Sequence, residues 1–350
     1  MTPAITVLMP AYNAAAFLHE GIESVLAQTW RNFELLIVED GSKDETLAIA
    51  RGVNDPRVRV LTNGRNLGLA ATLNHGLREA RGTFIARQDA DDLSHPERLA
   101  RQLARMEAEP SLFLLGSQAH LADLAGRSHG RIRLPCSTVA LRWASLFDNP
   151  FAHSTVFYRR AALLEEFGGY DETWRICEDW PLWSAVLRSH RAENLPDTLA
   201  TIRVHTASMC NAGSGALQEA CARIQAANFS AEFAGEKWTE AELALLGRLR
   251  TAVPPGDVPE FHRLFARARE AFIAKEPEAA WSRDFHSTIA RQFIRLGYNL
   301  LPHARGAAWR EMLRALRVDG SAASSIPWLR ALALTALGGR ARHIYQSATK

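Results

Sequence analysis

The sequence predicts an α/β fold: a mostly parallel sheet with helices on both faces, followed by a C-terminal helical extension. Over residues 1–110, apolar runs of strand length alternate with segments of helical spacing. The connections between them are short, which is typical of a parallel sheet whose helices cross over its faces. From about residue 210 the composition shifts to Ala, Arg and Leu with helical periodicity.

In the first 110 residues, strands and helices are expected to alternate strictly. The strands are the apolar runs at 5–9, 33–38, 58–61 and 83–87. The helices are the segments at 14–28, 43–52, 69–80 and 95–107, where apolar residues recur every three to four positions. Right-handed crossovers place the carboxyl ends of these strands at one edge, where open α/β sheets bind ligands.

After Pro110 the pattern is less regular. Strands are expected at 112–116, 154–158 and 199–204, the last of them at a sheet edge, and helices at 138–147, 160–167 and 180–188. We therefore divide the chain into residues 1–110, residues 111–209 and a helical extension over residues 210–350.

The helical extension is interrupted twice, at Pro254-Pro255-Gly256 and between Gly320 and Pro327. Its last segment, 328–345, mixes leucines with arginines at helical spacing. Such a helix either packs its apolar face on its own domain or lies on an anionic membrane surface.

The composition is that of a globular protein, with 47% hydrophobic and 23% charged residues among 350. The net charge of +3 is small and does not imply a nucleic-acid partner. The four cysteines form no C-x-x-C pair, which argues against zinc and for a reduced, cytoplasmic compartment. We expect neither a signal peptide nor a membrane-spanning helix.

An acidic run follows the expected strand at 83–87. Asp89, Asp91 and Asp92 lie within four residues, and like charges this close repel each other. A divalent cation that bridges to phosphate oxygens would relieve the repulsion, because carboxylate oxygens are the ligands that Mg²⁺ and Mn²⁺ prefer. The alternative is a solvated acidic loop. An EF-hand is excluded because Leu93 occupies a ligand position.

The loop after the first strand, Pro10-Ala11-Tyr12-Asn13, contains no glycine. The G-x-G-x-x-G turn of dinucleotide-binding folds is therefore absent, and so is a G-x-x-x-x-G-K-[ST] loop. The charge of a bound phosphate would then be met by a cation on the Asp89–Asp92 run.

Other polar residues follow strands or begin helices. Asp40 ends the second expected strand and could accept a hydrogen bond from a nucleobase or ribose, or could cap a helix or form a tight turn with Gly41. Glu178 and Asp179 precede the helix at 180–188, where they could stabilise the helix start or supply a general base. His205 follows a strand and could bind a metal or phosphate, although a lone histidine is more often structural. His153 is a weaker candidate of the same kind.

The order and spacing of these motifs resemble the family 2 glycosyltransferases of the GT-A fold. The resemblance covers about residues 4–207, and the motifs that carry it are Pro10–Asn13, Glu39–Thr46, Asn66–Ala70, Asp89–Asp92 and Glu178–Asp179. One departure is Glu39, which stands where the family usually has an aspartate.

The resemblance implies that residues 1–110 bind a nucleotide-sugar donor and residues 111–209 bind the acceptor. Asp40 matches the aspartate that contacts the nucleobase. The other donor-binding residues implied are Pro10, Ala11, Tyr12, Asn66, Asp89 and Ala90.

The same resemblance assigns the chemistry. Asp91 matches the direct metal ligand, Asp89 contacts ribose or reaches the metal through water, and His205 matches a histidine near the diphosphate, which adds it to the metal ligands. Asp179 matches the catalytic base, and Glu178 beside it shapes the acceptor site.

We therefore expect a metal-dependent, inverting transferase that uses Mn²⁺ or Mg²⁺ and moves a sugar, from UDP by analogy, to a glycan or lipid-linked hydroxyl in cell-surface polysaccharide synthesis. It would be cytoplasmic, with peripheral contact at the inner membrane face through the helix at 328–345. The rival interpretations are a nucleotidyltransferase and a non-catalytic carbohydrate-binding protein on the same fold.

Overall fold

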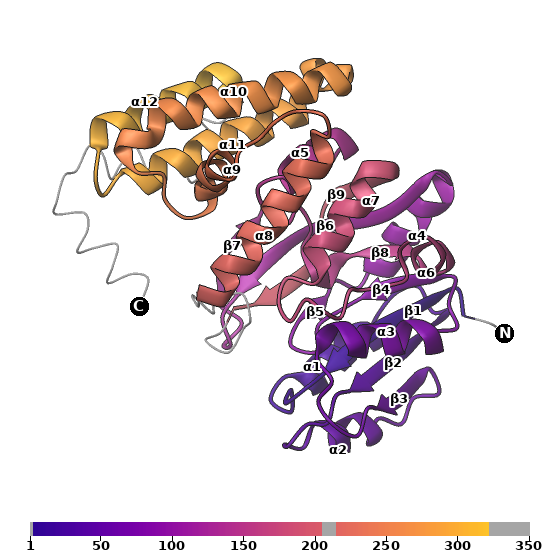
Figure 1. The fold of residues 1–350 in the computed structure, drawn as a ribbon. Coiled ribbons are helices and arrows are strands. Elements are labelled where there is room, and N and C mark those ends of the chain that lie inside the picture. Colours follow the sequence, from indigo (N-terminus) through magenta and orange to yellow (C-terminus); the bar gives the residue numbers. More distant parts are fainter. Residues whose placement is uncertain (1–2, 205–214, 322–350) are drawn as a thin grey trace. The chain divides into compact units, whose positions relative to one another are not determined.

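A computed structural model describes residues 3–204 and 215–321 of the chain (Figure 1). The chain forms two compact units. The first comprises residues 1–145 and 149–221, and the second comprises residues 146–148 and 222–350. The roles expected for residues 1–110, 111–209 and 210–350 stay predictions.

The described residues of the first unit build one nine-stranded sheet in the order β3-β2-β1-β4-β8-β6-β9-β5, with β7 paired to β6 (Figure 1). The strands are β1 (Ile5–Ala11), β2 (Phe33–Glu39), β3 (Val58–Thr62), β4 (Phe84–Arg87), β5 (Leu93–Ser94), β6 (Leu112–Ala122), β7 (Ser128–Ile132), β8 (Phe157–Arg159) and β9 (Arg191–Arg203). Strands β1 to β4 pair in parallel, as predicted. Beyond β4 the sheet is mixed, because β8 runs antiparallel to both β4 and β6.

The helices of this unit confirm the predicted alternation, and the helices before residue 150 are shorter than expected. They are α1 (Leu18–Leu26), α2 (Thr46–Arg51), α3 (Leu69–Glu79), α4 (Arg98–Ala108), α5 (Thr138–Ser145), α6 (Arg160–Phe167) and α7 (Asp179–Ser189). Helix α1 begins four residues later than expected, and the N–H groups of Ala14 and Ala15 in the preceding segment donate to the Thr46 hydroxyl and the Asp44 carboxylate. Asp44 is thereby held in the loop before α2.

Both faces of the parallel strands are buried. On β1, Ile5, Val7 and Met9 pack into one apolar cluster. Leu8 points to the opposite cluster with Leu73 of α3 and other residues. Because side chains alternate across a strand, a continuous apolar run is what a sheet covered on both sides requires. This explains why β1 and β2 could be predicted from apolar runs alone.

The strand predicted at 199–204 exists, but its expected position at the edge of the sheet was wrong. Strand β9 runs from Arg191 to Arg203 and lies between β6 and β5. Pro196 makes a central position hard to recognise from the sequence, because proline has no backbone N–H to donate to a neighbouring strand. The pairing with β6 steps from Leu195 to Thr198 at this point, so that a bulge takes up the proline.

The second unit is helical throughout its described part, which confirms the helical extension as a fold prediction. Its helices are α8 (Gly215–Glu232, shared with the first unit), α9 (Glu240–Gly247), α10 (Val258–Lys275), α11 (Arg283–Leu300) and α12 (Arg305–Val318). The break predicted at 254–256 is a 3₁₀ turn, Pro255–Asp257, between α9 and α10. The predicted basic helix at 328–345 lies outside the described residues.

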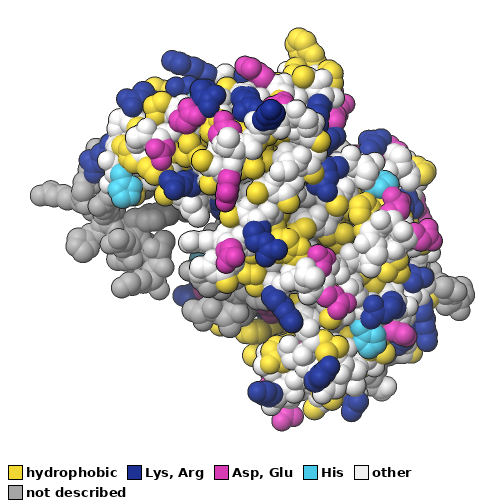
Figure 2. Space-filling view, in the orientation of Figure 1, with side chains coloured by type: hydrophobic (Ala, Val, Ile, Leu, Met, Phe, Trp, Pro, Cys, Tyr) yellow, Lys and Arg dark blue, Asp and Glu magenta, His cyan; other side chains and the backbone are white. Residues whose placement is uncertain are grey.

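Charged side chains of both signs are intermixed on the face of the molecule shown in Figure 2, as the small net charge predicts. In the part of the chain that the structure describes, every helix is too short or too polar to cross a bilayer.

Candidate active site

The acidic loop directly follows β4 at the carboxyl edge of the parallel strands. Carboxylate oxygens of Asp89, Asp91 and Asp92 all lie within 4.8 Å of one another. Asp92 is buried, and its Oδ1 accepts a hydrogen bond of 2.9 Å from the backbone N–H of Arg203. Burial, together with the charges of Asp89 and Asp91, raises the pKa of Asp92 well above its usual range.

This donor set fits a hard divalent cation. It offers oxygen atoms alone, and it crowds negative charge that a cation would offset. Asp89 and Asp91 are partly exposed, whereas Asp92 is buried and its carboxylate accepts a hydrogen bond from the backbone of β9. Asp89 and Asp91 are therefore the residues whose oxygens could reach a cation.

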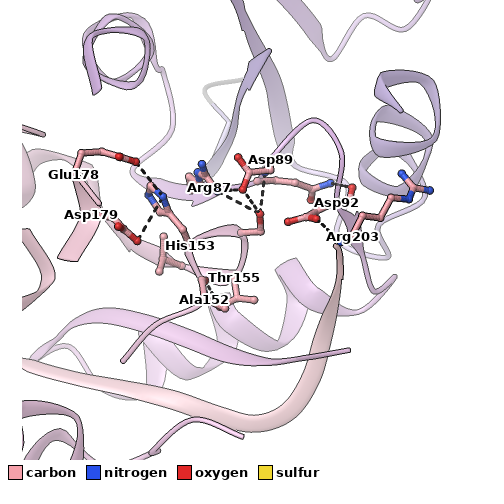
Figure 3. Close-up of polar contacts among 12 residues, drawn as sticks. Arg87, Asp89, Asp92, Ala152, His153, Thr155, Glu178, Asp179 and Arg203 are labelled. Atoms are coloured by element: carbon pink, nitrogen blue, oxygen red, sulfur yellow. Dashed lines mark hydrogen bonds and ion pairs between the residues drawn. The ribbon is translucent and has the colours of Figure 1, made fainter. Parts of the chain in front are cut away.

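A buried arginine and a buried serine hydroxyl hold the acidic loop in place (Figure 3). The Arg87 guanidinium forms an ion pair with Asp89. Burial opposes the charge of Arg87, yet the adjacent Asp89 carboxylate raises the pKa of Arg87 overall. Ser154 Oγ donates to Asp89 Oδ2 over 2.8 Å and accepts from the Asp89 N–H over 3.1 Å.

Two further arginines support the loop from the protein interior. Arg203 donates to the carbonyl oxygen of Asp91 over 2.9 Å and pairs with Glu20 of α1. Arg98 is fully buried and donates to the carbonyl oxygen of Arg87 over 2.7 Å. Burial lowers the pKa of Arg98 to about 9.

The second acidic group is the pair Glu178 and Asp179 at the start of α7. Both are buried, with 3% and 7% of their surface exposed. Cys177 before them has a φ of 59°, a left-handed conformation that costs a non-glycine residue about 1–3 kcal/mol and that clusters at functional sites.

The two carboxyl groups of this pair differ in their surroundings. Burial and the neighbouring Asp179 charge raise the pKa of Glu178 to about 7. Burial also raises the pKa of Asp179, but Asn149 Nδ2 donates to Asp179 Oδ2 over 2.6 Å and favours its charged form. When carboxyl groups interact this closely they share protons as a pair. Burial therefore favours the protonated form of Glu178, and the Asn149 hydrogen bond favours Asp179 as the charged member of the pair.

The two acidic groups belong to one site (Figure 3). They are joined by the 3₁₀ turn η1 (His153–Thr155), whose adjacent residues reach one group each. Ser154 binds Asp89, while His153 Nδ1 lies 3.6 Å from Asp179 Oδ2 and 3.7 Å from Glu178 Oε1. The Asp89 charge also contributes to the raised pKa of Glu178. The structure thus brings together the acids that the sequence singled out.

Sequence reasoning missed Arg87 and undervalued His153. Arg87 interrupts an apolar run at the end of β4, and a charge at an otherwise buried position was the available signal. His153 offered no such signal, because its partners come from residues 170–179, far along the chain.

Asp40 lies at the same edge of the sheet, after β2, and is buried. Its Oδ1 accepts from the N–H of Leu67 over 2.9 Å, and its Oδ2 accepts from Gly68 over 3.0 Å. Of the alternatives above, the helix cap is wrong, since α2 begins only at Thr46. Asp40 fixes the loop before α3, and its contact with a nucleobase stays a prediction.

The other expected donor-binding residues surround this edge or fall outside the description. Pro10 and Ala11 are buried at the end of β1, and Ala90 is buried in the acidic loop. Tyr12 is 44% exposed just beyond β1, and Asn66 is exposed beside the loop held by Asp40. His205 lies outside the described residues.

Residues 6–168 match the family described as glycosyl transferase family 2. The chain is 36% identical over 207 residues to the putative glycosyltransferase EpsE of Bacillus subtilis, covering 57% of this chain and 73% of that protein. It is 32% identical over 203 residues to the amylovoran biosynthesis glycosyltransferase AmsE of Erwinia amylovora, covering 57% of this chain and 75% of that protein.

Solved structures show the same fold at low identity. S. aureus TarS in complex with UDP-GlcNAc is 19% identical, with a TM-score of 0.55 over 91% of this chain and 90% of that chain. The mannosyltransferase PcManGT from Pyrobaculum calidifontis, solved with GDP-Man and Mn²⁺, is 19% identical, with a TM-score of 0.52 over 89% of this chain and 88% of that chain. The chain belongs to glycosyl transferase family 2 and is a glycosyltransferase of the GT-A fold.

Proposed function

We propose that this enzyme transfers a sugar, with inversion, from a nucleoside-diphosphate donor to a hydroxyl group of a glycan or lipid-linked acceptor. One observation carries the proposal: the turn η1 touches the acidic loop through Ser154 and the Glu178–Asp179 pair through His153. A site for a charged leaving group and a site for a proton acceptor are therefore neighbours.

In this proposal Asp179 is the general base. Its carboxylate takes the proton of the acceptor hydroxyl as that oxygen attacks the anomeric carbon, and the bond from this carbon to the diphosphate breaks. The nucleoside diphosphate leaves with the electron pair of that bond. A single displacement of this kind inverts the anomeric carbon and needs one base, whose contribution is about 10²–10⁴-fold. Protonated Glu178 leaves Asp179 as the charged member of the pair and can donate a hydrogen bond to the acceptor.

Asp91 and Asp89 would hold a divalent cation, Mn²⁺ or Mg²⁺. The cation supplies positive charge that offsets the charge developing on the leaving diphosphate. Two observations support this assignment: the accessible oxygens of these two aspartates, and the Mn²⁺ of the structurally similar PcManGT. His205 completes the proposed ligand set.

For the donor we favour a UDP-sugar, with Asp40 on the nucleobase and the Pro10–Tyr12 segment, Asn66 and Ala90 around the nucleotide. The support is the UDP-GlcNAc bound to TarS, while the GDP-Man bound to PcManGT shows that the fold also serves another base. For the acceptor we favour a cell-surface polysaccharide, because relatives are named for amylovoran and succinoglycan biosynthesis.

The direct test is nucleoside diphosphate release. A thermal-shift panel of UDP- and GDP-sugars with Mn²⁺ selects the donor, and slow hydrolysis of that donor is then followed. We expect EDTA to abolish the release and Asp91→Ala to reduce it, while Asp123→Ala in the β6–β7 turn serves as the control. Release that persists unchanged in EDTA would contradict the metal role, and binding without release would favour the non-catalytic rival.

We further propose a cytoplasmic enzyme that makes peripheral contact with an anionic membrane at its inner face. The helix at 328–345, to which this contact was assigned, lies outside the described residues, and helix α12 gives separate support. Trp309 and Leu313, one turn apart, are 36% and 39% exposed. Exposed arginines flank them, and the one acid of the helix, Glu311, is buried. Three exposed arginines of α12 form no ion pair with an acidic side chain within the described residues: Arg305, Arg310 and Arg317. Exposed aromatic and aliphatic side chains beside cations are typical of an interfacial helix.

Vesicle sedimentation tests the membrane contact. We expect the full chain to bind vesicles that contain phosphatidylglycerol but not pure phosphatidylcholine. Each arginine near such a surface contributes about 1 kcal/mol, so replacing three by glutamate should weaken binding about 100-fold or more. The α12 variant carries Arg305→Glu, Arg310→Glu and Arg317→Glu, and the charge-matched control carries Arg51→Glu, Arg78→Glu and Arg81→Glu. Equal loss in both variants, or no binding by the wild type, would contradict the proposal.

A further inference from the structure

His153 contacts both carboxyl groups of the Glu178–Asp179 pair (Figure 3). Its Nδ1 faces the carboxylates of Asp179 and Glu178, at 3.6 Å and 3.7 Å. Its Nε2 lies 3.0 Å from the hydroxyl oxygen of Tyr170. The ring also packs near the indole of Trp183, with 6.2 Å between centroids. The orientation of the imidazole is therefore fixed by packing and by a hydrogen bond at its far end.

The surroundings of His153 also determine which ring nitrogen carries the proton. Burial and the charge of Arg87 hold the pKa of His153 well below its usual range, so the ring is neutral and has one N–H. Burial, together with the neighbouring Tyr158, raises the pKa of Tyr170, so its hydroxyl keeps its proton and can donate it either to Nε2 of His153 or to the Tyr158 hydroxyl. The imidazole proton then belongs on Nδ1, where it meets the carboxylates. The opposite tautomer would aim a lone pair at the charged Asp179 carboxylate.

We propose that His153 is a positioning residue for the catalytic base: its Nδ1–H orients the Asp179 carboxylate, and the Tyr170 hydroxyl sets the tautomer. This rests on the proposed function, in which Asp179 takes the acceptor proton. The separation of 3.6 Å from Nδ1 to Asp179 Oδ2 is just beyond hydrogen-bond range. Catalytic hydrogen bonds are often long in the free enzyme and shorten once substrate is bound.

The placement of His153 also connects the proposed cation site with the proposed base. Its neighbour Ser154 binds Asp89, so one 3₁₀ turn touches both the proposed cation site and the proposed base. Neither the acidic loop nor α7 supplies this link by itself. A positioning role in η1 would therefore set how far the base lies from the leaving group.

NMR spectroscopy can identify the tautomer of His153 without any assay of activity. The full chain is labelled with ¹⁵N-histidine, and the His153 resonance is identified by its loss in His153→Gln. At pH 7 we expect a neutral ring protonated at Nδ1, the reverse of the tautomer that dominates for histidine in water. Tyr170→Phe should shift the ring toward Nε2–H. A wild-type ring that is protonated at Nε2, or at both nitrogens, would overturn the proposal.

A matched pair of substitutions tests the positioning role. The amide nitrogen of asparagine can replace Nδ1, whereas that of glutamine replaces Nε2. We therefore expect His153→Gln to lower kcat about 10–100-fold, the effect of losing a hydrogen bond to a charged group, and His153→Asn to restore most of it. The Kd for UDP with Mn²⁺ and the melting temperature serve as controls for binding and folding.

Wild-type kcat in His153→Gln, or equal losses in both variants, would overturn the positioning role. Failure of the proposed function looks different. Full transfer activity in Asp179→Asn would remove the base assignment, whatever tautomer the His153 spectrum shows.

Discussion

The two acidic groups of the active site consist of the same kind of side chain, the carboxylate, in opposite environments. In the loop after β4, Asp89 retains 35% exposure of its side chain and pairs with a buried arginine. At the start of α7, Glu178 and Asp179 are almost completely buried beside a histidine and an asparagine. The first group keeps oxygens available to a cation. In the proposed function the second exchanges a proton, because burial penalises two charges side by side.

This difference shows that the residue type does not decide the role. Removing a charge from the acidic loop should affect the binding of phosphate, and removing one from the α7 pair should affect proton transfer and pH dependence.

The largest effect is expected for Asp179→Asn. The substitution keeps the shape of the side chain but removes the proton acceptor, so kcat should fall about 10²–10⁴-fold. Donor affinity should stay that of the wild type, because the cation site is intact. Steady-state transfer rates, together with the melting temperature as a folding control, check this. A variant that keeps more than a tenth of the wild-type rate would break the division.

Glu178→Gln should stabilise the protein at high pH. The pKa of Glu178 is about 7 in the folded state against an ordinary value of 4.5, so the folded chain binds the proton more tightly than the unfolded chain. Wild-type stability therefore falls as the pH rises from 4.5 to 7, by about 3 kcal/mol in total. Glu178→Gln cannot ionise at this position, so its free energy of unfolding does not undergo this decrease.

Denaturant unfolding at pH 4.5 and pH 8 measures the effect. The advantage of Glu178→Gln should be present at pH 8 and absent at pH 4.5. Glu165→Gln on the exposed surface of α6 removes the same charge outside the site and serves as the control. A stability difference that does not change with pH would show that Glu178 carries its charge in the folded protein.

A smaller effect is expected on the pH–rate profile. Asp179 acts as a base only when ionised, so kcat/KM should fall as the pH drops through its raised pKa. Asn149 donates to Asp179 and favours the ionised form. Asn149→Ala should therefore move the acidic limb of the profile to higher pH. An unmoved limb would mean that another group controls it.

Much of this site could be predicted from local patterns. Apolar runs at β1 and β2 indicate strands buried on both faces, and the polar residues that follow them, such as Asp40, must then lie at one edge. The spacing of Asp89 and Asp91, and the adjacent Glu178 and Asp179, could be recognised because each motif is short.

The remainder depends on contacts between distant residues. Nothing near His153 in the sequence indicates Tyr170 or Asp179 as its neighbours. A proline such as Pro196 is unusual in a central strand, and only the pairing with β6 shows how a bulge takes it up. Arg87 was read as the end of an apolar strand, whereas its guanidinium pairs with the acidic loop.

Calorimetry of UDP binding in the presence of Mn²⁺ tests the central claim most directly. Asp91→Ala should weaken UDP binding at least about tenfold, to the level that EDTA produces in the wild type, while Asp179→Asn should bind UDP as the wild type does. Equal UDP affinity in the wild type and in Asp91→Ala, or a comparable loss in both variants, would contradict the division of roles between the two acidic groups.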